Sequence, residues 1–367
     1  MKSGRTLSEL AAEVERQAKA KYDLIADTRE LTLLNGTELH VAGGIGREFG
    51  VLPFAHRQIA THLGIPGQFY DRLQGQHPTI LDGLVNPLFR AEPSQRMVRT
   101  LDGRARAFLS NKYHPRDNFE LLESILPVLA QVPGVVFPTC EVTDSHLYVT
   151  ALSPRTEAFI PRGHSFQTGD PTGNDGGPRV GDVVQAGVRI KNSEVGMGFT
   201  EVQGLVYTLI CSNGAVTETG IRKMHAGRRI EVEEASEVYR DETIIADDRA
   251  FFLKVRDMVT AALDEARFRR AVDKLIATTT STPIADPSAG VKVLANRYNL
   301  TDQEQGGILH HLTLGGDLTL YGLLNAVTRH AQDVESYDRS MELEEVGGGL
   351  VDMTRDVWRE IATAVNA

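Results

Sequence analysis

A cysteine, a serine and an asparagine lie together where an apolar segment of the chain meets a turn. The segment LVYTLICSNGAV (205–216) starts with residues that suit a buried strand and then contains Asn213-Gly214, a pair typical of tight turns. A run of cations follows this turn: Arg222, Lys223, Arg228 and Arg229. The sequence therefore brings a nucleophile, an amide donor and phosphate-binding side chains to one short region.

An enzyme at this turn is one hypothesis, with Ser212, Asn213, Glu194 or His225 as its reacting groups. However, the chain has no G-x-S-x-G sequence, and a cysteine such as Cys211 at the end of a buried strand is usually a small core residue. It also lacks the glycine patterns of P-loops and dinucleotide sites, so we predict no cofactor. We favour a non-enzymatic role and keep the enzyme as the alternative.

The histidines and cysteines predict no metal site. His310 and His311 are adjacent in the sequence, and neighbouring residues on a helix point about 100° apart, so the two rings are not expected to share an ion. Cys140 and Cys211 have neither metal-ligand nor redox spacing.

Binding chemistry is the stronger signal, because two segments are basic in a chain whose net charge is −10. Residues 96–116 contain six Lys or Arg and one acid, and residues 179–229 contain seven against four. Cations and Asn side chains bind phosphates, and exposed rings such as that expected of Tyr113 stack on single-stranded bases. The predicted nucleic-acid-binding residues are Arg99, Arg104, Arg106, Lys112, Tyr113, Arg189, Lys191, Asn213, Arg222, Lys223, Arg228 and Arg229.

The N-terminal part of the chain reads as a helix, a hairpin and a pair of helices. Residues 7–22 have apolar positions at helical spacing, and Asn35-Gly36 predicts a hairpin turn. Residues 53–73 form two short helices divided at Gly64, which resemble a helix-turn-helix. A sequence-specific DNA-binding regulator is therefore a further alternative, although the second helix offers few side chains for base edges and an ordinary helical hairpin is favoured.

The central part predicts an antiparallel sheet with β-hairpin–helix units. Strands around the Asp102-Gly103 turn are followed by a helix that starts near Asn118, and we expect residues 97–109 and 183–216 to share one curved sheet. Glycine and polar residues fill 162–182, which predicts a long mobile loop.

The C-terminal part predicts helices alone, among them one long amphipathic helix over 247–278. The expected class is thus α+β with a C-terminal all-helical subdomain, divided into residues 1–80, 81–240 (with the loop 162–182) and 241–367. The cysteine pattern and an N-terminus unlike a signal peptide predict a cytoplasmic location. No apolar run approaches the roughly 20 residues that span a bilayer, so no membrane partner is expected.

Three segments resemble, in the same order, the blocks of a phage- and plasmid-associated family known as domain of unknown function 932. They are MVRTLDGRARAFLSNKYHPRDNFELLE (97–123), IKNSEVGMGFTEVQGLVYTLICSNGAV (190–216) and TLYGLLNAVTRHAQD (319–333). The resemblance spans residues 49–350, and the S-E-x-G and C-S-N-G sequences are its most specific part. It implies a mobile-element protein of the bacterial cytoplasm.

The expected architecture also has a fold-level likeness to single-strand annealing proteins related to Rad-fifty-two, Erf and RecT. Together with the two basic segments, this predicts an ATP-independent protein of a phage or plasmid that binds and anneals single-stranded DNA in recombination or replication. We expect it to act as a homo-oligomer. The enzyme and the sequence-specific regulator remain the alternatives.

Overall fold

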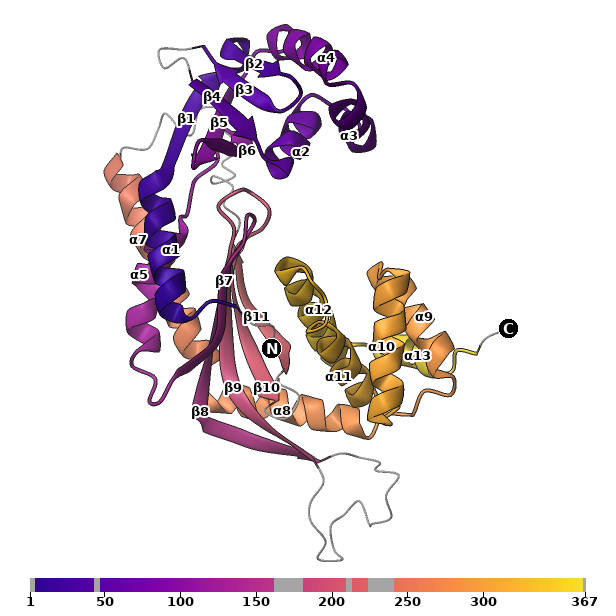
Figure 1. Cartoon of the computed structure of the whole chain (residues 1–367). Coiled ribbons are helices and arrows are strands. Elements are labelled where there is room, and N and C mark those ends of the chain that lie inside the picture. Colours follow the sequence, from indigo (N-terminus) through magenta and orange to yellow (C-terminus); the bar gives the residue numbers. More distant parts are fainter. Residues whose placement is uncertain (1–3, 43–46, 162–180, 209–212, 224–240, 366–367) are drawn as a thin grey trace, which may run out of the picture.

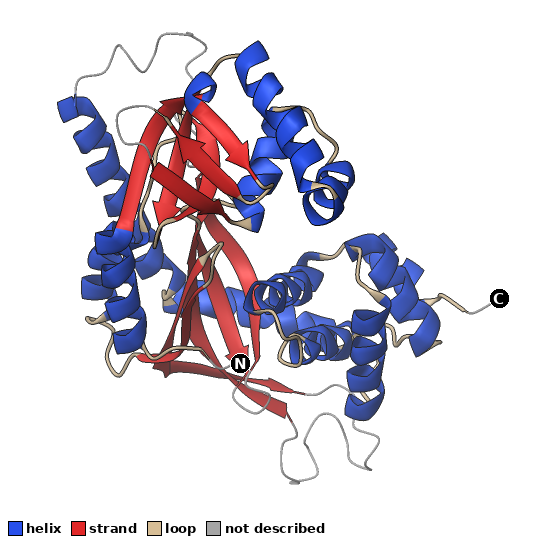
Figure 2. Ribbon diagram, turned by 45° about the horizontal axis from the view of Figure 1, so that its top comes forward, coloured by secondary structure: helices blue, strands red, loops and turns tan. Residues whose placement is uncertain are grey.

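The computed structural model describes residues 4–42, 47–161, 181–208, 213–223 and 241–365, and for 213–223 it describes the backbone pairing alone. Two sheets lie end to end, with helices on their faces, and the C-terminal part of the chain forms a further group of helices (Figures 1 and 2). The predicted α+β class with a C-terminal helical region is confirmed.

The first sheet is six-stranded and mixed, in the order β1-β5-β6-β4-β3-β2, with β4 and β6 parallel. Three α-helices and a short 3-10 helix, η1, belong to this part of the fold, and a cluster that includes Ile59, Tyr70 and Phe108 forms the core shared by the α-helices and the sheet. The strands are β1 (Lys21–Asp27), β2 (Leu31–Leu34), β3 (Glu38–Val41), β4 (Arg47–Val51), β5 (Gln95–Leu101) and β6 (Arg104–Ser110). The helices are η1 (Thr28–Glu30), α2 (Pro53–His62), α3 (Gly67–Gln76) and α4 (Pro78–Ala91).

Both hairpin turns predicted in this sheet are present. Asn35 and Gly36 join β2 to β3 with φ of 53° and 66°, and Asp102 and Gly103 join β5 to β6 with φ of 51° and 74°. Positive φ at two successive residues gives a hairpin turn the twist of its strands, which is why Asn-Gly and Asp-Gly favour it. The two helices divided at Gly64, where φ is 66°, are also confirmed.

The second sheet is five-stranded and antiparallel, in the order β11-β10-β9-β8-β7. Val188 and Ile190 of β9 share a core with α1, α5 and α7, whereas Arg189 and Lys191, which alternate with them, pair with Glu344 and Glu345 of α12 (Tyr337–Gly349). Figure 1 shows α1, α5 and α7 on one side of the sheet and α12 on the other. The strands are β7 (Val136–Val142), β8 (Leu147–Pro161), β9 (Gly181–Asn192), β10 (Thr200–Thr208) and β11 (Asn213–Lys223). The helices on the first face are α1 (Leu7–Ala20), α5 (Asn118–Leu129) and α7 (Asp241–Ala262).

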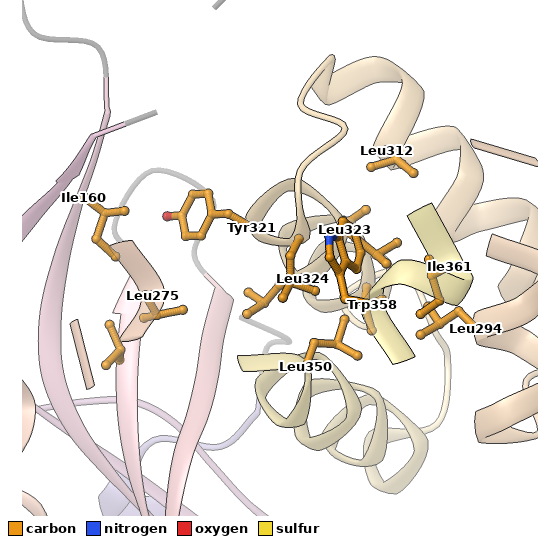
Figure 3. Close-up of a cluster of buried hydrophobic side chains, with 14 of the residues drawn as sticks. Ile160, Leu275, Leu294, Leu312, Tyr321, Leu323, Leu324, Leu350, Trp358 and Ile361 are labelled. Carbon is orange, nitrogen blue, oxygen red and sulfur yellow. The ribbon is translucent and has the colours of Figure 1, made fainter. Parts of the chain in front are cut away.

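The C-terminal helices enclose a large apolar core of their own. Trp358, Leu323 and Leu350 lie at its centre, and Tyr321 and Leu275 extend it to Ile160 of the second sheet (Figure 3). The helices are α8 (Glu265–Thr279), α9 (Pro287–Tyr298), α10 (Asp302–Gly315), α11 (Leu320–His330), α12 (Tyr337–Gly349), η2 (Leu350–Asp352) and α13 (Arg355–Ala362).

The prediction of one long helix over 247–278 is wrong, because the chain breaks between α7 and α8. The carboxylate of Asp264 accepts a hydrogen bond from the backbone N–H of Arg267 and so caps α8 as a new helix. The apolar periodicity continues through the break, which is why the pattern concealed it.

The prediction of one shared sheet is also wrong. β5 and β6 belong to the six-stranded sheet, whereas β9, β10 and β11 belong to the five-stranded one, and α5 packs on the latter. The predicted boundary between residues 1–80 and 81–240 falls inside the six-stranded sheet, because strands that precede residue 80 pair with strands that follow it. The prediction of a turn at Asn213-Gly214 is wrong, because these two residues belong to β11 and pair with Thr208 and Tyr207 of β10.

The predicted loop over 162–182 lies outside the described residues except for its last two. Gly181 and Asp182 begin β9, and the buried carboxylate of Asp182 accepts a hydrogen bond of 2.8 Å from the hydroxyl of Tyr321 on α11. This contact ties one end of the second sheet to the C-terminal helices.

Candidate functional site

The two basic segments meet at the junction of the two sheets, where Arg99 is the central residue. Its side chain is completely buried, and Nε and one terminal nitrogen donate to the carboxylates of Asp23 (2.9 Å) and Asp117 (2.6 Å). The other terminal nitrogen donates to the backbone carbonyl of Glu194 at 2.9 Å. Because Glu194 follows β9, this guanidinium joins the first sheet to the second.

Glu194 supplies the second ion pair of the junction. Its carboxylate accepts from Arg106 on β6 at 2.7 Å and from the backbone N–H of Asn118 at 2.6 Å. It thereby satisfies one of the open backbone N–H groups at the start of α5. The side chain of the N-cap residue Asp117 makes no capping hydrogen bond and is bound to Arg99 and Lys21 instead.

Uncharged groups complete the junction. Asn192 donates to the backbone carbonyl of Arg116 at 2.9 Å and to the side chain of Asn118 at 2.8 Å. Gln58 on α2 donates to the carbonyl of Val195 and accepts from the N–H of Phe108, both at 2.7 Å. The segment that follows β9 is thus fixed to both sheets by hydrogen bonds.

The surroundings of Asp117 favour its ionised form. Burial acts to raise the pKa of Asp117, but the charges of Arg99 and Lys21 outweigh it and hold that pKa below its ordinary value. Burial raises the pKa of the Tyr113 hydroxyl, which donates to the carbonyl of Ser193 at 3.4 Å. Tyr113 was expected to be exposed, but it is partly buried in this junction.

A second pair of predicted contact residues faces α12. Arg189 and Glu344 form an ion pair in which both side chains are fully buried, and Lys191 pairs with Glu345 at 3.3 Å. These cations bind the second sheet to the C-terminal helices.

The structure therefore does not gather the twelve predicted contact residues into one exposed groove. Arg99, Arg106 and Arg189 are buried against carboxylates and are not available to a phosphate, so we assign them a structural role. Arg104 and Lys112 are exposed. Tyr113 and Lys191 make the contacts described above. Of the other five, Asn213, Arg222 and Lys223 belong to β11, and Arg228 and Arg229 lie outside the described part of the chain.

The residues of the two alternative functions, the enzyme and the sequence-specific regulator, lie in different parts of the chain. Cys211, Ser212 and His225, proposed for an enzyme, lie outside the described residues. In the helical pair proposed for a regulator, His56 of α2 is buried and its Nδ1 lies 2.9 Å from the hydroxyl of Tyr70 on α3. That contact fixes the two helices to one another.

The sequence analysis missed one group of residues with metal-binding chemistry. His311, His330 and Asp333 lie together at the contact between α10 and α11. The spacing of His330 and Asp333 by three residues at a helix end is a usable signal in the sequence, whereas the adjacent pair His310-His311 is not.

Comparison of the chain with protein-family models, with curated proteins and with solved structures finds no match in any of the three. Among the described residues, no helix combines the length and the apolar composition needed to cross a membrane.

Proposed function

We propose that this protein binds single-stranded DNA without ATP and promotes its annealing, using the end of β11 and the residues that follow it. The observation that carries this proposal is a run of cations that begins on an edge strand. Arg222, Lys223, Arg228 and Arg229 have no acid among them, and no Asp or Glu occurs from 219 to 230. Arg222 and Lys223 end β11, which has β10 as its one neighbour among the described strands.

The fate of the other predicted cations supports this choice. Arg99, Arg106 and Arg189 each have a carboxylate partner inside the fold, so their charge is already balanced. The cations that begin on β11 are the densest group that remains from the predicted set. Lys and Arg bind phosphates irrespective of sequence and leave the bases free, which is the property that annealing requires.

The edge position of β11 also supports assembly of several copies. An edge strand presents backbone N–H and C=O groups that a second chain can pair with. A homo-oligomer would place several such cation groups along one DNA strand. The setting we propose is a mobile genetic element in the bacterial cytoplasm.

The test is the salt dependence of binding to a labelled single-stranded oligonucleotide, measured by fluorescence anisotropy at several salt concentrations. Each phosphate neutralised on a single strand contributes about 0.7 to the slope of log affinity against log salt. Arg222→Ala/Lys223→Ala should therefore weaken binding and reduce the slope by about 1.4 if both side chains contact phosphates.

Arg269→Ala/Arg270→Ala is the matched control, because it removes the same charge from exposed positions on α8. It should leave the slope unchanged. Equal effects of the two double variants, or no binding by the wild type, would contradict the proposal. Preference for one duplex sequence would favour the regulator instead.

A further inference from the structure

His311, His330 and Asp333 form a compact group on the C-terminal helices. His311 lies on α10, His330 is the last residue of α11, and Asp333 follows in the turn after it. One ring nitrogen of each histidine and one carboxylate oxygen of Asp333 lie within 4.8 Å of one another. Nε2 of His311 is 2.6 Å from Oδ2 of Asp333.

Local structure brings these side chains together. The backbone N–H of Asp333 donates to the carbonyl of His330 at 2.9 Å, which folds the chain back after α11. Gly307 stands one helical turn before His311, on the same face of α10. A Cβ at Gly307 would lie 2.2 Å from the ring of His330, so the ring can approach α10 only because this residue is glycine.

One polar atom of the group has no hydrogen-bond partner in the part of the chain that the structure describes. Nε2 of His330 is buried and makes no hydrogen bond, and the residue as a whole is 7% exposed. Leaving a buried polar group without a partner costs about 1–3 kcal/mol, so such an atom indicates a ligand that the protein alone does not supply.

We propose that His311, His330 and Asp333 bind one divalent transition-metal ion, for which Zn²⁺ is the best fit. Two imidazoles and a carboxylate are a ligand set of Zn²⁺ sites that keep a fourth position open, whereas Mg²⁺ and Ca²⁺ prefer oxygen ligands throughout. At Zn–N and Zn–O distances of about 2.0–2.2 Å, tetrahedral ligand atoms are about 3.3–3.6 Å apart. To bind the ion, the most widely separated ligand atoms must therefore approach one another by about 1 Å, and the atoms of His311 and Asp333 must move apart. Rotation of the side chains can supply both changes.

The surroundings suit an ion at this place. Arg329 lies 3.8 Å from Oδ1 of Asp333, so it orients the carboxylate while Oδ2 faces His311. The nearby acid Glu304 is held by Arg339 at 2.7 Å and is not available as a competing ligand. The open position would be filled by water or by a ligand that offers an oxygen, nitrogen or sulfur atom.

The experiment uses the full chain after dialysis against a chelator, with the metal ion alone as the probe. Co²⁺ should give visible d–d absorption with an intensity typical of four-coordinate nitrogen–oxygen sites, and Zn²⁺ should abolish it at one ion per chain. His330→Ala and His311→Ala should each weaken Zn²⁺ binding at least 10-fold in calorimetric titration, as should Asp333→Asn.

His310→Ala is the matched control, since it removes an exposed imidazole next to His311 on the same helix. It should keep the affinity of the wild type. Far-UV circular dichroism of each variant checks its folding, and Asp333, whose side chain is 47% exposed, provides a variant that loses little core packing. No binding by the folded wild type, or equal binding by folded Asp333→Asn or folded His311→Ala, would overturn the proposal.

Discussion

Replacing Arg99 by methionine tests whether the junction cation holds the fold together or binds a phosphate. The change removes the charge and keeps an apolar chain of similar length, which leaves Asp23 and Asp117 without their shared partner. Breaking a buried ion pair in this way costs about 3–5 kcal/mol. Asp117 retains Lys21, and Asp23 is 24% exposed and can be hydrated, so we expect the lower end, about 3 kcal/mol.

The assay is urea unfolding followed by far-UV circular dichroism, with Arg16→Met as the control. Arg16 also contacts two carboxylates, those of Glu13 at 2.9 Å and Asp102 at 2.8 Å, but its side chain is 47% exposed. Solvent screens such pairs, so its loss should cost less than about 1 kcal/mol. If both variants lost the same free energy of unfolding, or if Arg99→Met lost DNA affinity at unchanged stability, the structural role of Arg99 would be refuted.

Three further predictions concern burial and backbone conformation. Burial lowers the pKa of His56 to about 4 from 6.5, so the unfolded chain binds this proton at a higher pH than the folded chain. The contribution of His56 to the free energy of unfolding should therefore be complete above pH 6.5 and be lost as the pH falls toward 4. His56→Phe should flatten this part of a pH–stability profile. Burial raises the pKa of the Cys140 thiol to about 11, so native Cys211→Ser protein should resist a thiol reagent at about pH 8 and react once denatured. Gly103 and Gly196 both have φ of 74°, but a Cβ meets open space at the first and a side-chain carbon at 2.7 Å at the second. Thermal melts should therefore show a cost of about 1–2 kcal/mol for Gly103→Ala and a larger one for Gly196→Ala.

The sequence predicted those parts of the fold that depend on neighbouring residues. The turns at Asn35-Gly36 and Asp102-Gly103 formed as expected, because the energy of a positive φ is a property of one or two residues. The helix over 7–22 is present as α1, ending at Ala20, where β1 begins. The helical C-terminal region was equally predictable from its periodicity.

Parts of the fold that depend on distant partners could not be predicted in this way. Arg99 and Arg106 were expected at a surface because cations usually lie there. Their partners Asp23 and Glu194 stand far away in the sequence, 76 residues from Arg99 in the case of Asp23. For the same reason, the sequence does not predict the contact between His311 and Asp333, which are 22 residues apart.

The residues from which the sequence analysis predicted a family resemblance have structural reasons for their identities. Within the S-E-x-G sequence, the Ser193 carbonyl accepts from Tyr113, Glu194 pairs with Arg106 and caps α5, and Gly196 adopts a positive φ against Leu109. These contacts join the two sheets and leave none of these groups for a ligand.

A chain that had only the S-E-x-G sequence in common with this protein would therefore share the junction between the sheets, and nothing about its activity would follow. DNA binding as proposed requires in addition the cations from Arg222 to Arg229, and metal binding requires the two histidines and the aspartate on α10 and α11. Because the two sets of residues are separate in the sequence, each can be removed without the other. If the variants of the cations lost only DNA affinity and the variants of the histidines and the aspartate lost only Zn²⁺ affinity, the two sites would be independent, and the junction would be a scaffold for both.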